Sequence, residues 1–366
     1  MRVLVAMSGG VDSSVAAALL KEEGYEVIGV TLDFGVRVDS GCCGVESAMD
    51  AKRVAGKLGV PHYTLDLKDL FHREIVLPFC REYSLGRTPN PCIRCNRTVK
   101  FEVLLRKAGE FGADLIATGH YARVEFDRAL GRYTLKKGVD RAKDQSYMLY
   151  LLTQEQLGRA TFPLGDLTKE EVRAIARRMG LHTAGRPESQ EICFVPDGRY
   201  PELVGRYFPE ALRPGPILDT EGEVLGRHKG IAYYTVGQRR GLGLALGRPL
   251  YVVRIDPERN AIVVGGKEEV LAEGLLASDV NLVSVPEISE PMKVKAKVRY
   301  RHPEADATVF PLEDGKLLVK FSEPQEAVTP GQSVVFYLGD VVVGGGTIEE
   351  AWREGEEVAS RAQGGP

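Results

Sequence analysis

The residues best suited to chemistry begin near the N-terminus, where positions 8–13 read Ser-Gly-Gly-Val-Asp-Ser. Glycines allow backbone N–H groups to approach an anion without obstruction by Cβ atoms, and a helix that follows adds positive partial charge. The run lacks the lysine of a Walker A loop and the glycine spacing of a dinucleotide fingerprint. It therefore predicts a phosphate-binding loop of another type. The simpler alternative is a tight turn in which Asp12 or Ser13 caps the helix.

Cysteines form the second set of reactive side chains. The chain has six, namely Cys42, Cys43, Cys80, Cys92, Cys95 and Cys193. A Cys-x-x-Cys pair such as Cys92 and Cys95 indicates metal or redox chemistry in a cytosolic protein, where structural disulfides are rare. Structural zinc is disfavoured because it usually requires a second such pair. An iron–sulfur cluster held by Cys92, Cys95 and Cys193 stays open as an alternative but is not favoured.

The other three cysteines carry weaker signals. Cys80 follows an apolar stretch at 75–79, and a cysteine in that setting usually packs as a small buried hydrophobe. We therefore expect Cys80 in the core. Cys42 and Cys43 lie in a glycine-flanked loop, and their spacing assigns them no role.

The elements that must position these residues follow a β/α pattern in the first half of the chain. Short apolar runs at 2–7, 26–32, 62–65 and 114–118 predict buried strands, and the pattern at 46–58 predicts a helix. Strands that alternate with helices form a parallel sheet, and ligands bind beyond the carboxyl ends of its strands. We therefore expect an α/β domain with a parallel, doubly wound sheet.

From about residue 207 the pattern changes to short strands separated by turns rich in Gly, Pro, Asp and Asn. We expect three domains: a catalytic α/β domain over 1–206, a small, mainly β central domain over 207–268, and a C-terminal β-barrel-like domain over 269–360. The tail from Arg361 onward is expected to be disordered.

Composition narrows the class of protein. The 366 residues are 43% hydrophobic and 27% charged, as in ordinary globular proteins with two or three domains. The apolar run at 2–7 is too short for a signal peptide, and no segment approaches membrane-spanning length. We expect a cytoplasmic protein without a membrane partner. The net charge of −3 means that a nucleic-acid partner would need locally concentrated basic residues.

One segment has that local concentration. Its basic residues alternate with apolar residues or Tyr, and they are Lys293, Lys295, Lys297, Arg299 and Arg301. On a strand, period two places all five on one face, where their repulsion calls for acidic neighbours or a polyanion. An RNA backbone would satisfy that face, and glutamates on adjacent strands would do so equally well. The pattern alone does not choose between these partners.

Further segments identify the family that the chain resembles. The loop at 8–13 is similar to the PP-loop of ATP pyrophosphatases, which release pyrophosphate from ATP and transfer AMP. The other segments are 86–96 (GRTPNPCIRCN), 117–122 (ATGHYA), 143–147 (KDQSY), 189–194 (SQEICF), 234–242 (YTVGQRRGL) and 299–301 (RYR). Together they resemble the bacterial tRNA-specific 2-thiouridylases from residue 6 to about residue 345.

This resemblance implies a set of site residues. Those implied to contact ATP are Ala6, Met7, Ser8, Gly9, Gly10, Val11, Asp12, Ser13, Leu32 and Gly119. Those implied to contact the target base are Asn90, Pro91 and Cys92. Those implied to contact tRNA are His120, Lys143, Asp144, Gln145, Arg299, Tyr300 and Gln332, which favours RNA as the partner of the basic segment and of the C-terminal domain. Cys95 matches the family nucleophile and Cys193 the cysteine that carries a persulfide, and no metal site is implied.

The activity implied is that of a tRNA-uridine 2-sulfurtransferase. ATP, expected with Mg²⁺, docks at the loop, the C2 oxygen of the wobble uridine attacks the α-phosphate, and pyrophosphate leaves. Sulfur from a persulfide on Cys193 then displaces AMP, and Cys95 resolves the intermediate to give 2-thiouridine. An exposed anticodon loop suits this chemistry because its bases can be unstacked. The expected partners are tRNA and a persulfide-donating sulfur carrier protein, and the family chemistry implies a disulfide bond.

Two rival functions fit parts of the sequence. A PP-loop ligase or amidotransferase acting on a small metabolite would need neither Cys95 nor Cys193. An ATP-gated RNA-binding protein whose cysteines hold metal would bind tRNA without forming stoichiometric AMP. One position also departs from the family, because many members have Asp where this chain has Cys92. A thiol with a pKa of ~8.5 differs greatly from a carboxyl group with a pKa of ~4, so the proton-transfer group is not assigned.

Overall fold

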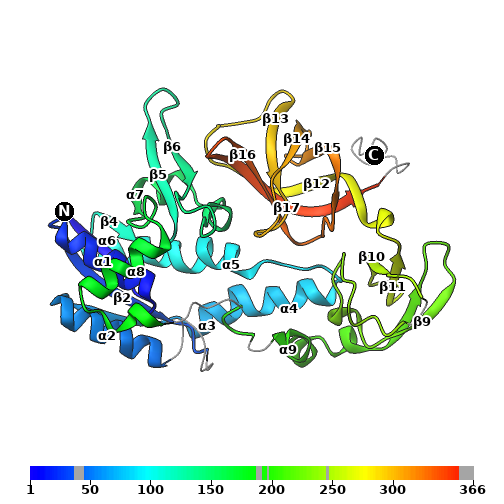
Figure 1. Cartoon of the computed structure of the whole chain (residues 1–366), viewed down its shortest axis with the longest axis horizontal. Helices are drawn as coiled ribbons and strands as arrows, with labels where there is room; N and C mark the ends of the chain where they lie inside the picture. The colour runs from blue at the N-terminus through cyan, green and yellow to red at the C-terminus, as the bar shows by residue number, and fades with distance from the viewer. Residues whose placement is uncertain (37–44, 187–191, 196–197, 245–246, 354–366) are drawn as a thin grey trace.

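A computed structural model describes most of the chain, namely residues 1–36, 45–186, 192–195, 198–244 and 247–353. An N-terminal α/β region lies at the left of Figure 1, a small β region at the lower right and a β-barrel at the upper right. Cys42, Cys43 and the tail from Arg361 lie outside the described residues. Within the described part of the chain, no helix combines the length and the apolar character needed to span a membrane.

The N-terminal region is built on a five-stranded sheet whose strands are all parallel, in the order β3-β2-β1-β4-β7. The strands are β1 (Arg2–Ala6), β2 (Glu26–Asp33), β3 (His62–Asp66), β4 (Leu115–Ala117) and β7 (Ala160–Thr161). Leu4 of β1 packs into one hydrophobic cluster, while Val3 and Val5 pack into another on the opposite face. Burial of both faces explains why the strand is a continuous apolar run. The expected parallel α/β fold is confirmed.

Helices cover this sheet. They are α1 (Val11–Glu22), α2 (Val45–Leu58), α6 (Glu102–Glu110), α7 (Gln154–Arg159) and α8 (Lys169–Arg178). The helix expected at 46–58 is confirmed as α2. α8 begins at a capping box, in which the side chains of Thr168 and Glu171 each accept a backbone N–H of the other. It packs against α1, which joins β1 to β2.

An irregular helical segment connects β3 to α6, and the strand pattern of the sequence does not predict it. Its parts are α3 (Lys68–Phe71), η1 (His72–Val76), α4 (Leu77–Ser84), α5 (Pro91–Arg94) and η2 (Cys95–Phe101). η1 and η2 are π-helical, a rare geometry that is frequent at functional sites. η2 begins at Cys95.

The C-terminal region is a barrel of six strands in the order β12-β15-β14-β13-β16-β17, closed by pairing of β12 with β17. The strands are β12 (Leu271–Leu282), β13 (Met292–Lys297), β14 (Ala305–Pro311), β15 (Leu317–Glu326), β16 (Ser333–Leu338) and β17 (Val341–Trp352). Val319, Val334 and Phe336 are fully buried in its interior. The expected C-terminal barrel is confirmed.

A hairpin of the N-terminal region extends the barrel sheet. The two strands are β5 (Ala122–Asp127) and β6 (Arg132–Lys137), which rise beside the barrel in Figure 1. Lys136 of β6 pairs with Val341 of β17, and the Lys137 N–H donates to the Asp340 carbonyl oxygen at 2.9 Å. The first and last regions of the chain therefore share a single eight-stranded sheet.

The central region holds a four-stranded sheet in the order β10-β11-β8-β9, so it is mainly β as expected. Its strands and flanking helical turns are β8 (Gly215–Leu218), β9 (Val224–His228), β10 (Tyr251–Asp256), β11 (Ala261–Gly265), α9 (Tyr200–Tyr207), η6 (Pro209–Leu212), η7 (Ile231–Tyr233) and η8 (Glu268–Val270). Two further turns in the N-terminal region are η3 (Ser146–Leu149) and η4 (His182–Gly185). Ile217, Ile262 and Val264 fill a small hydrophobic core that belongs to the central region.

The expectation that five cations line one face of a strand is wrong. β13 ends at Lys297, and the residues that follow turn toward β14. Lys293 and Lys295 are exposed on the strand, whereas Arg299 is half-buried beyond its end. The turn breaks the period of two, so the alternation in the sequence does not persist in space.

Candidate active site

The loop between β1 and α1 folds on itself through its serines. The Ser8 N–H donates to Ser13 Oγ at 3.0 Å, and the two hydroxyl oxygens lie 3.2 Å apart. The Ser14 hydroxyl donates to the Gly10 carbonyl oxygen at 2.7 Å. Gly10 occupies the N-cap of α1 and no side chain caps the helix, so capping by Asp12 or Ser13 is wrong. The first N–H groups of α1 thus keep the capacity to bind an anion.

Two glycines allow other segments to reach this loop. Gly9 has φ +74°, and a Cβ atom there would lie 2.1 Å from the Ser47 carbonyl oxygen at the start of α2. A Cβ atom on Gly119, beyond the end of β4, would lie 2.7 Å from the backbone nitrogen of Ser13. Neither position tolerates a side chain without displacement of the backbone. The loop is therefore enclosed by backbone from β1, α2 and the β4 end.

The residues implied to contact ATP come together at the carboxyl ends of these strands. The Met7 N–H donates to the Val30 carbonyl oxygen at 2.7 Å, which continues the pairing of β1 with β2. Leu32 follows two residues later near the end of β2, and Gly119 contacts the loop from the other side. This is the edge at which parallel α/β sheets bind ligands.

Asp12 is held in place by two residues that the sequence reasoning missed. Its carboxylate accepts a hydrogen bond from the Tyr121 hydroxyl at 2.8 Å. The Lys169 ammonium lies 2.7 and 2.8 Å from its two oxygens. Tyr121 belongs to the segment that also holds Gly119, which was the available signal. Lys169 carries no signal in the sequence beyond its place directly after Thr168, the N-cap of α8.

Arg186 is a third residue that the sequence reasoning missed. Its guanidinium donates to the Gly9 carbonyl oxygen at 2.9 Å and pairs with the Asp50 carboxylate of α2. It therefore links the loop to the helix packed against it. Arg186 stands at the end of a described segment, and its place between Gly185 and Pro187 is the only signal that the sequence offered.

The cysteine pair begins at a capped helix. The Asn90 Oδ1 accepts the Cys92 N–H at 3.1 Å, and Pro91 occupies the first helical position of α5. Asn and Pro are both favoured at these positions, so the Asn-Pro-Cys run has a local structural cause. Cys92 is exposed on this first turn, whereas Cys95, one turn later, is buried.

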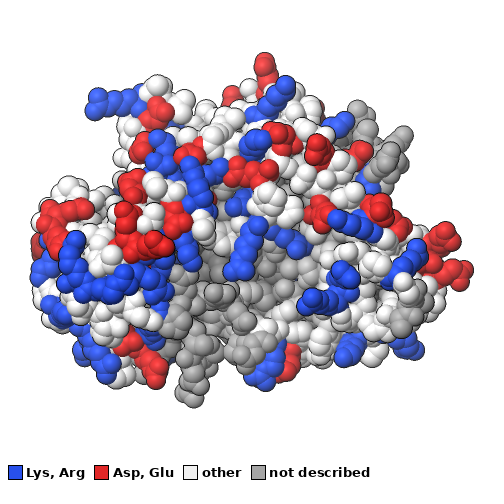
Figure 2. Space-filling model, viewed as in Figure 1, with Lys and Arg blue, Asp and Glu red and all other residues white. Residues whose placement is uncertain are grey.

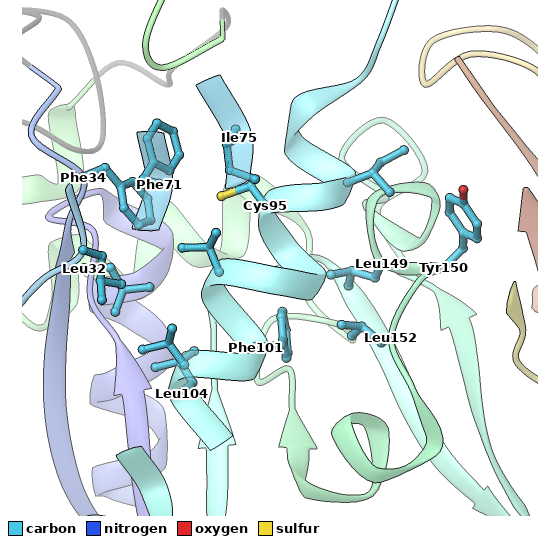
Figure 3. Close-up of a cluster of buried hydrophobic side chains, with 14 of the residues drawn as sticks. Leu32, Phe34, Phe71, Ile75, Cys95, Phe101, Leu104, Leu149, Tyr150 and Leu152 are labelled. Carbon is cyan, nitrogen blue, oxygen red and sulfur yellow. The ribbon is translucent and has the colours of Figure 1, made fainter. Parts of the chain in front are cut away.

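Cys95 lies in the largest hydrophobic cluster of the N-terminal region. Its side chain is 6% exposed and sits beside Ile75, with the sulfur directed toward Phe71 and Phe34 (Figure 3). Phe34 and Phe71 stack with ring centroids 4.5 Å apart. Leu32 from the end of β2 belongs to the same cluster. The buried thiol and the carboxyl end of β2 therefore share one hydrophobic cluster.

Cys193 packs against the same cluster. Its neighbour Phe194 contacts Phe71 edge-on at 5.6 Å and Phe79 at 5.1 Å between ring centroids. Cys193 itself is half-buried. Aromatic pairs of this kind contribute ~0.5–1.5 kcal/mol beyond the burial of their area. Phe194 therefore anchors the short described segment that carries Cys193 to α3 and α4, whose Phe71 and Phe79 share a cluster with Cys95.

Cys80 is confirmed as a core residue. It is fully buried in α4, and burial raises the pKa of its thiol to about 11. Among the described cysteines the structure contains no disulfide bond, so the expected disulfide is not seen. The described residues also contain no group of three His, Cys, Asp or Glu side chains arranged to hold a metal ion. Cys92, Cys95 and Cys193 are accordingly not gathered as cluster ligands.

His120 is enclosed by aromatic rings. Its ring packs near Phe101 and Phe162, and its Nδ1 lies 2.7 Å from the Thr118 hydroxyl oxygen. Burial, with a smaller contribution from the Lys100 ammonium, lowers the pKa of His120 to about 3. The imidazole is therefore neutral at physiological pH. It offers a hydrogen bond or a stacking surface rather than a charge.

The Lys143-Asp144-Gln145 segment is tied into the fold. The buried Asp144 carboxylate accepts hydrogen bonds from the Gly138 N–H at 3.0 Å and from the Ser146 hydroxyl at 3.0 Å. Gln145 Oε1 accepts the Tyr121 N–H at 3.0 Å. Lys143 is half-buried. All three residues of this segment are implied to contact tRNA. The Asp144 carboxylate, however, has its hydrogen-bond donors within the protein. Gln145 holds the backbone of Tyr121, whose hydroxyl contacts Asp12.

Three regions of the chain meet just before the cysteine pair. The Thr88 N–H donates to the Pro330 carbonyl oxygen at 2.9 Å, and Gln332 Nε2 donates to the Thr88 carbonyl oxygen at 2.7 Å. The Thr88 hydroxyl lies 3.1 Å from that of Thr235 in the central region. Arg87 bridges to Glu349 of the barrel at 2.8 Å. Gln332, implied to contact tRNA, therefore contacts the segment that leads to Cys92.

Arg299 and Tyr300 also lie at a contact between regions. Arg299 donates to the Val236 carbonyl oxygen of the central region at 3.0 Å and to the Thr329 hydroxyl. Its burial lowers the pKa of the guanidinium, although neighbouring tyrosines oppose the shift. Tyr300 packs 6.0 Å from Tyr147, measured between ring centroids. Both side chains thus join the barrel to the other regions.

Charged side chains of both signs are interspersed on the face drawn in Figure 2, over all three regions. On the barrel, Lys295 pairs with Asp306 of the neighbouring strand at 2.8 Å. Acidic neighbours, which were one of the two explanations for the basic segment, are therefore present at this position. Lys293, two residues before Lys295 on the same strand, is exposed and lies opposite Thr308 of β14.

The chain matches three family models in succession. Residues 1–197 match the tRNA methyl transferase HUP domain, residues 202–266 the tRNA methyl transferase PRC-barrel domain, and residues 272–348 the aminomethyltransferase beta-barrel domain. A solved structure, the U34-tRNA thiolase NcsA from Methanococcus maripaludis with its 4Fe–4S cluster, is 21% identical. It covers 56% of this chain and 64% of that chain, with a TM-score of 0.35.

Curated relatives match from end to end. The tRNA-specific 2-thiouridylase MnmA of Acetivibrio thermocellus is 54% identical over 355 residues, which are 95% of this chain and 99% of that protein. The tRNA-specific 2-thiouridylase MnmA 1 of Caldanaerobacter subterraneus is 55% identical over 359 residues, which are 96% and 99%. The domain names mention methyl transfer, but these full-length relatives are thiouridylases. The chain therefore belongs to the tRNA-specific 2-thiouridylases, sulfurtransferases whose N-terminal HUP domain uses ATP.

Proposed function

We propose that this chain converts the wobble uridine of tRNA into 2-thiouridine in the cytoplasm, by adenylating the C2 oxygen and then transferring sulfur from a cysteine persulfide. One observation carries the proposal. A single hydrophobic cluster contains Leu32 at the nucleotide edge and Cys95, and Cys193 packs against it. Both cysteines therefore lie in or against a cluster that reaches the carboxyl end of β2 beside the loop at 8–13, which supports a two-step reaction on one base.

Activation comes first. ATP lies along the loop at 8–13, with Met7, Leu32 and Gly119 around it, and the C2 oxygen of uracil attacks the α-phosphate. The bond to the bridging oxygen breaks, its electron pair leaves with pyrophosphate, and N3 releases its proton to water. The uncapped N–H groups of α1 support this role because they stabilise negative charge on phosphate. Magnesium, when bound with ATP, supplies further neutralisation of phosphate charge, and Asp12 is the residue that we expect to hold it.

Sulfur transfer follows. The terminal sulfur of the Cys193 persulfide attacks C2, and AMP leaves with the C2 oxygen. The Cys95 thiolate then attacks the Cys193 sulfur, which forms a disulfide and releases the 2-thiolate of the base; N3 takes up a proton again. An external thiol reduces the disulfide, and a persulfide-donating carrier protein reloads Cys193. The half-buried position of Cys193 supports this order, because one face of the residue meets solvent and another the cluster of Cys95.

The remaining site residues position the RNA. We assign Asn90, Pro91 and Cys92 to the target base, since Cys92 is exposed on the turn before Cys95. His120 and Lys143 are assigned to the tRNA. Asp144, Gln145, Arg299, Tyr300 and Gln332 act on tRNA through the surfaces that they hold together, because their polar groups contact other parts of the protein.

An iron–sulfur route through Cys92, Cys95 and Cys193 is the alternative. The described residues offer no group of three such ligands in reach of one metal ion, and we derive no step through a cluster. Protein purified without oxygen decides the matter. Bound iron in stoichiometric amount, lost in each of the three Cys→Ser variants, would replace the persulfide route.

The test of the activity uses labelled ATP and tRNA. We expect AMP and pyrophosphate to form only when tRNA is present. Once a persulfide donor is supplied, mass spectrometry should show that sulfur has replaced one oxygen of the wobble uridine. Asp12→Ala should lose nearly all turnover. ADP and phosphate as the main products would exclude the adenylation, and so would AMP formation that ignores tRNA.

A further inference from the structure

The N-terminus of α8 carries a buried lysine that the reaction above does not use. Lys169 is 8% exposed, directly after the N-cap Thr168. Its backbone N–H donates to the Asp140 carboxylate at 2.9 Å, which fixes the start of the helix. A lysine is seldom buried to this degree unless its charge is met by another.

The charge is met at the phosphate loop. The Lys169 ammonium lies 2.7 Å from Asp12 Oδ1 and 2.8 Å from Oδ2, and 5.7 Å from the centre of the Tyr121 ring. Asp12 is the second residue of α1, and the next residue, Ser13, has its backbone nitrogen against Gly119. The ammonium group therefore contacts the first turn of α1, whose backbone N–H groups would receive a phosphate.

ATP would change the balance of charge at this point. A polyphosphate attracts the ammonium, and the divalent cation that accompanies it attracts the Asp12 carboxylate. The lysine side chain has four methylene groups between the backbone and the ammonium group. It binds phosphate as a point charge and therefore needs no fixed orientation. Lys169 and Asp12 can thus exchange partners through side-chain rotation, without any movement of α1 or α8.

We propose that Lys169 is the phosphate-binding lysine of this loop, supplied by α8 rather than by the loop sequence. In the free protein it neutralises Asp12; with ATP bound it contacts the β- and γ-phosphates. As the bond from the α-phosphate breaks, the ammonium keeps its proton and stabilises the electron pair left on the departing pyrophosphate. This inference rests on the proposed adenylation and adds the residue that assists its leaving group.

Among the described residues Arg186 is a further cation at the loop, and it suits this role less well. Its guanidinium already donates to the Gly9 carbonyl oxygen and pairs with the Asp50 carboxylate of α2. A cation that contacts a carbonyl oxygen of the loop supports the shape of the loop. Lys169, by contrast, contacts a carboxylate that metal-bound ATP would itself engage.

The test measures the leaving group directly. Isothermal titration with magnesium pyrophosphate, and in parallel with AMP, is compared for wild type, Lys169→Met and Arg178→Met. Arg178 lies at the far end of α8 and pairs with Glu22 on the surface, so it is a matched loss of one cation from the same helix. We expect Lys169→Met to bind pyrophosphate about tenfold to hundredfold more weakly, as for loss of one charged hydrogen bond, with AMP binding unchanged.

Rates give a second readout. In a single turnover with ATP and tRNA, Lys169→Met should release pyrophosphate about 10²–10³-fold more slowly, and Lys169→Arg should recover part of the loss. Lys169→Met leaves Asp12 without its cation, and if that variant unfolds, Asp12→Asn is compared with Asp12→Asn/Lys169→Met. These two variants differ only in the lysine, and the double variant leaves neither charge unpaired. They are compared by titration with magnesium pyrophosphate, because loss of Asp12 is itself expected to stop turnover.

The outcomes separate the two proposals. Pyrophosphate affinity and release rate within twofold of the control in Lys169→Met would overturn the role of Lys169. Wild-type protein that forms ADP would overturn the adenylation instead, while the titration with pyrophosphate would still report on the lysine. Unchanged AMP binding shows that the loop of the variant is folded.

Discussion

The side-chain amide of Gln332 donates a hydrogen bond to the carbonyl oxygen of Thr88 at 2.7 Å, so the barrel holds the segment that leads into the cysteine pair. The contact joins residues 244 positions apart. Thr88 is held on its other side by Pro330. A shift of the barrel would therefore act on the backbone four residues before Cys92.

This contact predicts a stability effect. Gln332→Ala leaves the Thr88 carbonyl oxygen without its donor, and we expect the free energy of unfolding to fall by ~1 kcal/mol. Adenylation should slow as well, because the segment before Cys92 loosens. Urea unfolding and pyrophosphate release are measured together. Gln325→Ala is the control, since the Gln325 amide donates to the nearby carbonyl oxygens of Glu323 and Pro324 near the end of β15. A fall in tRNA affinity at unchanged stability would assign Gln332 to direct RNA contact instead.

The two reactive cysteines should separate the two steps of the reaction. We expect Cys193→Ser and Cys95→Ser each to abolish thiolation while tRNA-dependent AMP formation remains, since activation precedes sulfur transfer. Thiolated nucleoside and AMP are measured in the same samples. Cys80→Ser, the core control, should keep both activities and lose only some stability. Thiolation that survives in Cys193→Ser would remove the persulfide from the mechanism.

Cys92 occupies the position at which many relatives carry Asp. It is exposed, and its backbone N–H is held by Asn90. We expect Cys92→Ser to keep thiolation within about tenfold of wild type, because the persulfide route uses only Cys95 and Cys193. The rate is measured alongside iron content in protein prepared without oxygen. Loss of activity together with loss of iron would point to the cluster route.

His120 makes a prediction about pH. Burial, aided by Lys100, lowers its pKa to about 3, whereas in the unfolded chain it is near 6.5. Unfolding therefore takes up a proton at this residue below about pH 6.5, so its contribution to stability is complete above that pH and declines toward pH 3. We expect His120→Gln to reduce proton uptake on unfolding by up to one proton between about pH 4 and 6.

The same residue can be observed directly. Urea unfolding across that pH range gives the proton uptake, and NMR of the ring protons gives the titration of His120. A ring that titrates near pH 6.5 in the folded protein would contradict the burial argument. A neutral ring also means that the rate of adenylation should show no inflection from His120 around neutral pH.

The basic segment predicts two different phenotypes. Lys293→Gln and Lys295→Gln should each lower the salt dependence of tRNA binding by about 0.9 units of slope if the strand contacts phosphate. Arg299→Gln should leave the slope unchanged and lower the stability, because Arg299 joins the barrel to Val236. Binding is measured at several salt concentrations. Equal slopes in wild type and both lysine variants would mean that these lysines pair with acidic residues such as Asp306 and not with RNA phosphate.

Local patterns predicted the elements that depend on local forces. β1, β2, β3 and β4 were expected from their apolar runs, and each is found within about two residues of its predicted ends. The hairpin β5–β6 was not expected, because its strands alternate weakly and are completed by a barrel strand some 200 residues later. The π-helical turn at Cys95 has no sequence rule, since it reflects how the connecting helix fits its neighbours.

The site residues also divide into those that local patterns predict and those that depend on distant contacts. Asp12 and the glycines at 9 and 10 are recognisable from type and spacing. The two donors to Asp12, Tyr121 and Lys169, are 109 and 157 residues away in the chain, and no local pattern links them. The burial of Arg299 was likewise unpredictable, because it depends on where the central region packs. The sequence therefore identified the groups that we propose to bind ligand more readily than the residues that hold those groups in place.

The turn at Asp340 has a consequence for how such chains can be recombined. Its carboxylate accepts hydrogen bonds from Arg123 at 3.1 Å and from Arg141 at 2.7 and 2.8 Å, both from the N-terminal region. A hybrid that took its barrel from a relative with a neutral residue here would bring two guanidinium groups together with no acid between them. The three positions must therefore be inherited as a set, and a swap of whole domains that ignored them would be penalised at this one turn before any tRNA was bound.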